Sequence, residues 1–223
     1  TIPDITKMMA GHQRVYAMTL GDIIFDSNAM WPAMQSSMAS VNNGNAYIPF
    51  FQTIGNHDHD ATQPDTSDDL LDDYNATALF EDRFGPTDYS FNRGDVHIVS
   101  IDNVPVSSAS RNISPNRYVW NYSAGLTRDK YEWLKADLAL VPDKARKAVI
   151  LCMHIPMRAG ANGSGGSNFN LDKYYSEVLD LLTQFREVHI MTGHTHYTQN
   201  YIHEYYVCQG GLPIYEHIHG ANR

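Results

Sequence analysis

Five side chains of metal-binding type lie just after apolar runs of the sequence: Asp22, Asn56, His154, His194 and His196. Carboxylate, amide oxygen and imidazole groups all bind divalent cations, and no thiolate is among them. Because such donors suit several ions, the metal could be Mn, Fe, Zn or a similar divalent cation. The residue types therefore indicate a divalent metal site of oxygen and nitrogen ligands.

Each of these residues also has a purely structural interpretation when it is considered alone. Asp22 follows a glycine and could be a turn residue or a helix cap. His154 could be a buried, hydrogen-bonded histidine, whereas His194 and His196 are alternate residues that face the same way on an extended segment. A specified four-residue word such as that at 55–58 should arise by chance in only about one of several hundred chains of this length. The combination of segments therefore favours the metal site.

The elements that must position these side chains alternate along the chain between strand-like and helix-like patterns. Apolar, β-branched runs predict strands at 15–20, 47–54, 148–153 and 188–192, and helical patterns occupy 30–41, 67–84, 127–141 and 172–185. Alternating strands and helices predict an α/β domain with a largely parallel sheet. The candidate ligands follow the strands, where α/β folds place their functional groups.

Two further patterns predict hairpins, which would make the sheets mixed. Residues 89–91 and 96–101 alternate in polarity on either side of a short turn, and a second hairpin is expected through 197–202 and 205–209. Two packed sheets flanked by helices accommodate both the parallel strands expected from the alternating pattern and the antiparallel strands of the hairpins. Residues 158–170 are rich in glycine and are expected to form a loop, either one that covers the site or a plain surface loop.

Composition excludes several classes of protein. The 223 residues include 16 basic and 25 acidic side chains, and the formal charge of −9 argues against nonspecific nucleic-acid binding. No apolar run approaches the roughly 20 residues that a membrane-spanning helix needs. The two cysteines, Cys152 and Cys208, cannot form a disulfide scaffold or a thiolate zinc site, and Cys152 is expected to be a small buried residue.

The ordered motifs resemble those of the calcineurin-like metallophosphoesterases. The resemblance rests on Gly21-Asp22-x-x-x-Asp26, Gly55-Asn56-His57-Asp58, His154 and Gly193-His194-x-His196, and it covers about residues 20–196. It implies a four-layer αββα sandwich of two mixed β-sheets flanked by helices. It also implies a centre of two divalent metal ions at the carboxyl ends of the strands.

The resemblance assigns a role to each candidate ligand. Asp22 would bridge both metals, Asn56, His154 and His194 would complete one site, and His196 would belong to the other. Such a centre would cleave a phosphomonoester or a phosphodiester through a metal-activated hydroxide. The expected partner is a small phosphorylated substrate, with no nucleic acid and no membrane span; nothing in the sequence indicates an oligomeric state.

The same resemblance assigns catalytic roles near the metals. His57 would donate a proton to the leaving oxygen or stabilise the charge on the phosphoryl group. Asp26 or Asp58 would orient His57, unless these two carboxylates serve as ordinary turn or capping groups.

The sequence departs from the family pattern in one respect. Members usually carry Asp-x-His upstream of the Gly-Asp motif, and none precedes Gly21 here. The second metal would then keep only Asp22 and His196. We expect residues 1–223 to be a single domain, trimmed at the N-terminus and possibly at the C-terminus, whose parent protein holds two metals; this chain would hold one or none.

The departure leaves a second interpretation open. The alternative is a catalytically silent metal-binding or recognition domain of a larger extracytoplasmic protein. The low charge content and loops rich in Tyr and Asn favour an extracytoplasmic location, periplasmic or secreted, without deciding it.

Several other side chains have either a functional or a structural interpretation. Arg158 could contact a phosphate oxygen or be a solvated loop residue, and His217 and His219 alternate like the pair at 194 and 196 without a recognisable strand end before them. The aromatic candidates for a substrate groove, which could equally be packing residues, are Trp31, Tyr118, Trp120 and Tyr122.

Overall fold

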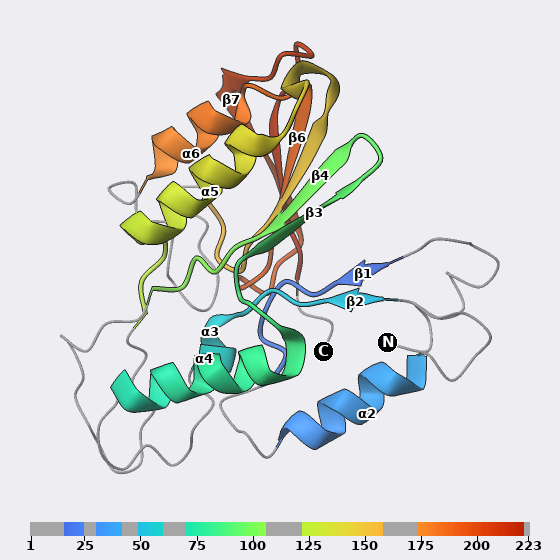
Figure 1. The fold of residues 1–223 in the computed structure, drawn as a ribbon, viewed down its shortest axis with the longest axis vertical. Helices are drawn as coiled ribbons and strands as arrows, with labels where there is room; N and C mark the ends of the chain where they lie inside the picture. The colour runs from blue at the N-terminus through green and yellow to red at the C-terminus, as the bar shows by residue number, and fades with distance from the viewer. Residues whose placement is uncertain are drawn as a thin grey trace.

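The computed structural model describes residues 16–24, 30–41, 49–59, 70–105, 122–157 and 174–220. Within them, six strands form one sheet in the order β3-β4-β5-β6-β8-β7, and β1 and β2 form a second (Figure 1). The strands are β1 (Ala17–Met18), β2 (Phe50–Phe51), β3 (Tyr89–Arg93), β4 (Val96–Ser100), β5 (Ala148–Cys152), β6 (Glu187–Thr192), β7 (Gln199–Val207) and β8 (Pro213–Ile218).

The large sheet is mixed. Strands β4, β5, β6 and β8 run parallel, whereas β3 and β7 pair antiparallel with β4 and β8 at the two edges. The carboxyl ends of the four parallel strands consequently meet at one edge of the sheet. The loops that follow them are brought together there, as the sequence predicts.

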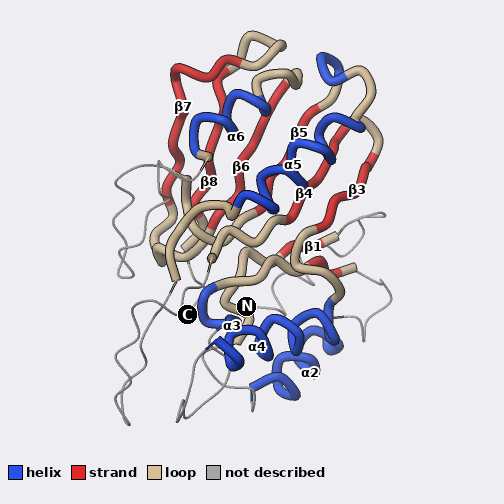
Figure 2. The backbone as a smooth tube through the Cα atoms, turned by 60° about the vertical axis from the view of Figure 1, so that its left-hand side comes forward, coloured by secondary structure: helices blue, strands red, loops and turns tan. Residues whose placement is uncertain are grey.

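The helices complete four layers. Helices α5 (Arg128–Leu140) and α6 (Tyr175–Leu182) cover one face of the large sheet, and α2 (Trp31–Val41) and α4 (Leu70–Phe84) lie beyond the small sheet (Figures 1 and 2). The predicted αββα order is confirmed, although the described part of the small sheet is a parallel pair and not mixed. No helix in the described ranges is both long and apolar enough to cross a membrane.

The main core lies between the large sheet and its two helices. Val149 and Leu151 on β5 are fully buried against Leu134 of α5 and Leu179 of α6. Because successive strand residues face opposite sides, Cys152 points to the other face, where its Sγ lies 3.7 Å from Met18 Sδ. Cys152 is therefore the buried residue that the sequence predicts.

Aromatic and apolar side chains join the remaining layers. Phe51 of β2 stacks on Phe91 of β3 with ring centroids 4.4 Å apart, which fixes the small sheet against the large one. A second core, around the buried Trp31, Ile54 and Phe80, attaches α2 and α4 to the small sheet. Trp31 is fully buried and so lines no substrate groove.

The prediction of a hairpin between 197 and 209 is wrong. Residues 199–207 form the single strand β7, with a register irregularity between His203 and Val207, and the reversal comes after it. The turn is closed by hydrogen bonds between Cys208 N and Leu212 O (2.8 Å) and between Gly211 N and Cys208 O (2.9 Å). Gly211 supplies the positive φ (79°) that this turn requires, and the following strand, β8, was not predicted.

Helix α5 offers a test of the main core. Thr127 caps the helix, since its side chain accepts a hydrogen bond from Lys130 N. Leu134 is fully buried in the core, whereas Leu140 on the same helix is 83% exposed. We expect Leu134→Ala to lower the free energy of unfolding by about 2–5 kcal/mol because it leaves a cavity. Leu140→Ala should change it by less than about 0.5 kcal/mol. Urea unfolding followed by circular dichroism measures both, and equal losses would contradict the placement of α5.

Candidate metal centre

Four of the predicted ligands meet where strands from both sheets end. Asp22 follows β1, and Asn56 begins the one-turn helix α3 (Asn56–His59) after β2. His154 follows β5 and His194 follows β6. These loops therefore bring together residues from nearly the whole length of the described chain.

The ligand atoms lie as close together as donors around one cation. His154 Nε2 is 2.8 Å from Asn56 Oδ1 and 3.3 Å from Asp22 Oδ1. His194 Nδ1 is 3.0 Å from Asn56 Oδ1 and 3.2 Å from His154 Nε2. Donors that bind one cation at about 2.1 Å lie roughly 3.0–3.4 Å from one another. The spacing thus suits a divalent ion.

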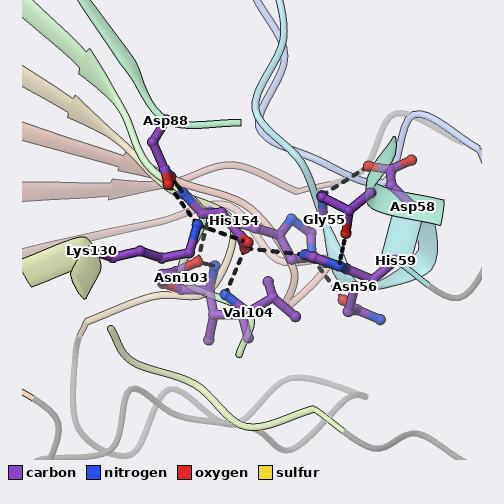
Figure 3. Close-up of polar contacts among 12 residues, drawn as sticks. Gly55, Asn56, Asp58, His59, Asp88, Asn103, Val104, Lys130 and His154 are labelled. Atoms are coloured by element: carbon purple, nitrogen blue, oxygen red, sulfur yellow. Dashed lines mark hydrogen bonds and ion pairs between the residues drawn. The ribbon is translucent and has the colours of Figure 1, made fainter. Parts of the chain in front are cut away.

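Hydrogen bonding outside the cluster orients His154. Its Nδ1 lies 2.6 Å from the carbonyl oxygen of Leu20, so Nδ1–H donates to that oxygen and Nε2 faces the cluster. Figure 3 shows the ring turned toward Asn56. The oxygens of Asp22 and Asn56 that meet Nε2 are both acceptors, so the three groups can share the space only around a positive charge, whether a proton or a metal ion.

The charges of these groups respond to one another. Burial alone would raise the pKa of Asp22, but the imidazoles of His154 and His57 hold that pKa well below its ordinary value. Burial would lower the pKa of His154, and the Asp22 carboxylate raises it instead. For His194, burial and the neighbouring His154 lower the pKa to about 4, so its ring is neutral near pH 7 and has a lone pair for a metal.

Of the two ring nitrogens of His194, Nδ1 faces the cluster and Nε2 has no partner in the described ranges. His194 Nε2 is buried and makes no hydrogen bond to any group in the described ranges. An unsatisfied buried polar atom costs about 1–3 kcal/mol. The fit to a cation rests on the other face of the ring, where His194 Nδ1 meets the converging Asn56 Oδ1 and His154 Nε2.

The backbone at the ligands is strained. Asp22 (φ 54°), His194 (φ 65°) and His196 (φ 60°) are three of the five non-glycine residues with positive φ in the described chain. Each such residue costs on the order of 1–3 kcal/mol and persists only where its surroundings impose it. The loops are therefore held in these conformations by contacts beyond the ligands themselves.

Two glycines of the predicted motifs allow the loops to approach. A Cβ at Gly55 would overlap the backbone nitrogen and Oδ1 of Asp22, and a Cβ at Gly21 would overlap the ring of His154. Gly21 also has a φ of 89°. Close backbone approach therefore explains why glycine precedes Asp22 and Asn56.

Asp58 has a capping role. Its Oδ1 accepts hydrogen bonds from the backbone N–H groups of Ile23 (2.9 Å) and Ile24 (3.0 Å), and its Oδ2 accepts one from Gly55 N (2.8 Å). These contacts are those of a capping group, and the role of orienting His57 stays a prediction. Asp58 ties the loop that carries Asp22 to the loop that carries Asn56.

His57 and His196 lie beside the cluster of four. His57 donates its backbone N–H to Asp22 Oδ1 at 3.1 Å, and its imidazole is close enough to lower the pKa of Asp22. His196 lines a cavity of about 750 Å³ together with Asp22, His154 and His194. His196 is not among the side chains whose ligand atoms lie within 4.8 Å of one another.

The remaining candidates have mixed outcomes. His219 also lines the cavity and directly follows β8, so the expectation that no strand end precedes it is wrong. His217 lies on β8, where its Nε2 is 2.9 Å from His189 Nδ1. The Tyr122 ring meets the ring of His194 edge to face at 5.9 Å. Asp26, Arg158, Tyr118, Trp120 and the loop at 158–170 lie outside the described residues.

Asn103, which follows β4, was missed by the sequence analysis. Its Oδ1 accepts hydrogen bonds from the backbone N–H groups of His154 (3.1 Å) and Ile155 (3.0 Å), and its Nδ2 donates to Ile155 O at 2.6 Å. Asn103 is fully buried and so fixes the loop that carries His154. Its position after an apolar strand was the signal available, since the same signal marked the other candidates.

Asp102, the residue before Asn103, supports α3. Its Oδ1 meets His59 Nε2 at 3.2 Å, and its Oδ2 meets Lys130 Nζ at 3.2 Å. Figure 3 shows Lys130 extended toward Asp88 as well, at 2.6 Å. Burial would raise the pKa of Asp102, but His59 and Lys130 hold it below its ordinary value. The dipeptide after β4 thus supports both α3 and the His154 loop.

Comparison with known proteins identifies the family. Residues 2–198 match the calcineurin-like phosphoesterases, so the chain belongs to that family and is a metal-dependent phosphoric ester hydrolase. A comparison with curated protein sequences gave no match.

Solved structures of low sequence identity share the fold. A dimetal phosphatase from Danio rerio superposes with a TM-score of 0.62 at 15% identity, over 99% of this chain and 76% of that one. Purple acid phosphatase PPD1 from yellow lupin seeds gives 0.63 at 14% identity, over 97% of this chain and 38% of that one. The structure of PhoD gives 0.61 at 13% identity, over 97% of this chain and 53% of that one.

The contacts of Asp102 with His59 and Lys130 predict how the stability of the fold changes in acid. Because the folded-state pKa of Asp102 lies below the ordinary value of about 3.9, its stabilisation is complete above that pH and is lost as the pH falls through the folded pKa. We expect Asp102→Asn to lower the free energy of unfolding of metal-free protein at pH 7 by about 3 kcal/mol or more. Below about pH 3 the difference in the free energy of unfolding between Asp102→Asn and wild type should become smaller.

Urea unfolding at several pH values measures this difference. Asp95→Asn is the control, because the Asp95 carboxylate is paired with Lys147 at 2.7 Å but is mostly exposed. Its effect at pH 7 should be small. A difference for Asp102→Asn that stays constant from pH 7 to pH 2 would contradict the assignment.

Proposed function

We propose that this chain binds divalent metal through Asp22, Asn56, His154 and His194, with His196 contributing to a second metal, and hydrolyses a phosphomonoester or phosphodiester of a small substrate. The observation that carries the proposal is the convergence of Asp22 Oδ1, Asn56 Oδ1 and His194 Nδ1 around His154 Nε2. Two divalent cations, when bound, lower the pKa of water and neutralise phosphoryl oxygens.

The protein's own charges favour an anionic substrate at this centre. Asp22 is the one carboxylate among the four converging ligands, since Asn56 and the two imidazoles add donors without negative charge. A divalent ion there leaves the site net positive. The adjoining cavity of about 750 Å³ is large enough for a small phosphorylated molecule.

His57 is placed to handle the proton of the reaction. Its backbone is held by Asp22, and its ring lies close enough to Asp22 and His194 to influence the pKa of both. In the proposed reaction the His57 imidazole donates a proton to the leaving oxygen as the ester bond breaks. His154 meanwhile donates its backbone N–H to Asn103 Oδ1 and its Nδ1–H to the Leu20 carbonyl oxygen, which hold its backbone and its ring in place.

Metal content and hydrolysis together test the proposal. The protein supplied with Mn²⁺ is expected to cleave p-nitrophenyl phosphate or bis(p-nitrophenyl) phosphate, with metal content measured by elemental analysis. His57→Ala should lower kcat by about 10²–10⁴-fold and leave the metal content unchanged, because it removes a proton donor and no ligand. His194→Ala should lower both.

The two possible functions give different results in this experiment. A metal-loaded protein that cleaves neither ester, nor any phosphate ester in a broad panel, would be the silent metal-binding domain. A protein that takes up no metal would contradict both functions.

A further inference from the structure

A buried carboxylate lies beneath the metal-bearing loops on the helix-covered side of the large sheet. Glu216 is the fourth residue of β8 and is fully buried, between Ile214 and Ile218 on the same face. A carboxylate in such a place is costly unless hydrogen bonds and a partner compensate it. The contacts of the Glu216 carboxylate therefore indicate its role.

One oxygen of Glu216 faces a histidine and a tyrosine. Oε2 lies 2.9 Å from His203 Nε2, on the neighbouring strand β7, and both side chains are essentially inaccessible to solvent. His203 Nδ1 in turn lies 3.0 Å from the hydroxyl of Tyr175, the first residue of α6. Tyr175 and His203 thus hold Glu216 in one orientation.

The other oxygen joins the two loops that carry imidazole ligands. Glu216 Oε1 accepts a hydrogen bond from the backbone N–H of Met157 at 2.7 Å and from the hydroxyl of Thr192 at 3.4 Å. Met157 lies three residues after His154, and Thr192 lies two residues before His194. A single atom therefore contacts both segments, three residues after one imidazole and two residues before the other.

The hydrogen bonds of Glu216 lie next to strained backbone at His194. His194 adopts a φ of 65°, which its surroundings must impose. The nitrogens of the two imidazoles are 3.2 Å apart, so a small shift of either loop would change the ligand geometry. The hydrogen bonds from Met157 and Thr192 to Glu216 limit such shifts.

Net stability is a weak explanation for the buried pair. Replacing a buried ion pair by well-packed apolar residues is often neutral or stabilising. Residues that orient metal ligands through hydrogen bonds, in contrast, commonly change metal affinity by about 10–100-fold when they are replaced. Glu216 is of this orienting type, because it accepts hydrogen bonds from Met157 and Thr192, which lie close in sequence to His154 and His194.

We infer that Glu216, oriented by His203 and Tyr175, is a positioning residue that sets the separation of His154 and His194. This inference rests on the proposed metal centre. Glu216 touches no substrate in this role; it acts through the backbone at Met157 and the hydroxyl of Thr192.

The test compares two replacements of Glu216 by metal titration of chelator-treated protein. Glu216→Met has nearly the same length but no acceptor, and is expected to weaken Mn²⁺ binding by about 10-fold or more. Glu216→Gln can still accept from Met157 N and donate to His203, so its affinity should stay within about threefold of wild type. Isothermal titration calorimetry measures both dissociation constants.

A matched control is available at the other end of the sheet. Asp137 Oδ2 meets the buried His97 Nε2 at 2.9 Å, and its other oxygen accepts from Ser90. Asp137→Leu removes an acceptor from a similar pair and should leave the Mn²⁺ dissociation constant within about twofold, since Ser90 and His97 are not ligands. The absorption spectrum of Co²⁺-substituted protein should change for Glu216→Met and not for Asp137→Leu.

Glu216→Met leaves His203 without its partner and could fail to fold. The double variant Glu216→Met with His203→Leu replaces the pair by apolar residues and should fold. It still offers no acceptor to Met157 N, so its metal affinity should remain low.

Each result has a defined meaning. Wild-type affinity in folded Glu216→Met or in the double variant would overturn the positioning role. So would equal weakening by Asp137→Leu, or a Glu216→Gln as weak as Glu216→Met. Absence of Mn²⁺ binding by wild type would instead contradict the proposed function and, with it, the metal centre on which this inference rests.

Discussion

The structure depends on the repulsion between electron pairs that the fold brings together. Asn56 Oδ1 and Asp22 Oδ1 present lone pairs to His154 Nε2 at 2.8 and 3.3 Å, and His154 cannot turn away because Leu20 holds its other nitrogen. Such a convergence is unfavourable unless a cation occupies it. The positive φ values, the glycines without room for a Cβ and the hydrogen-bonded supports around the loops all maintain this arrangement.

The supports are side chains that are not themselves proposed ligands. Asp58 ties together the two loops from the small sheet, Asn103 fixes the His154 loop from β4, and Glu216 reaches the His154 and His194 loops from β8. All three are buried polar residues whose acceptors meet backbone N–H groups. The scaffold therefore controls the ligands chiefly by controlling the backbone that carries them.

The sequence predicted the parts of this molecule that follow from local pattern. Strand β5 and helix α5 with its Thr127 cap have clear apolar periodicity, and the ligand motifs stand at strand ends. Strand β8 was missed because its buried positions are Ile214, Glu216 and Ile218, and a buried carboxylate interrupts the apolar alternation on which strand prediction relies.

The roles of residues that act through distant partners could not be read from the sequence, even where, as at Asn103, the position after an apolar strand was visible. Asn103 and Glu216 have meaning only through backbone groups 51 to 59 positions away. No local pattern encodes such pairs. The turn at Gly211 was missed for a simpler reason. The polar residues at 203–204 were interpreted as the turn of a hairpin, but they lie within the continuous edge strand β7.

The wide sequence separation of the ligands has a consequence for how the protein matures. Asp22 lies before most of the described chain and His194 near its end, so the four donors meet only after the parallel strands have assembled. We therefore expect no nucleation of folding by an ion, in contrast to small zinc domains whose ligands are neighbours in sequence. We therefore expect the proposed metal to bind to an already ordered apoprotein.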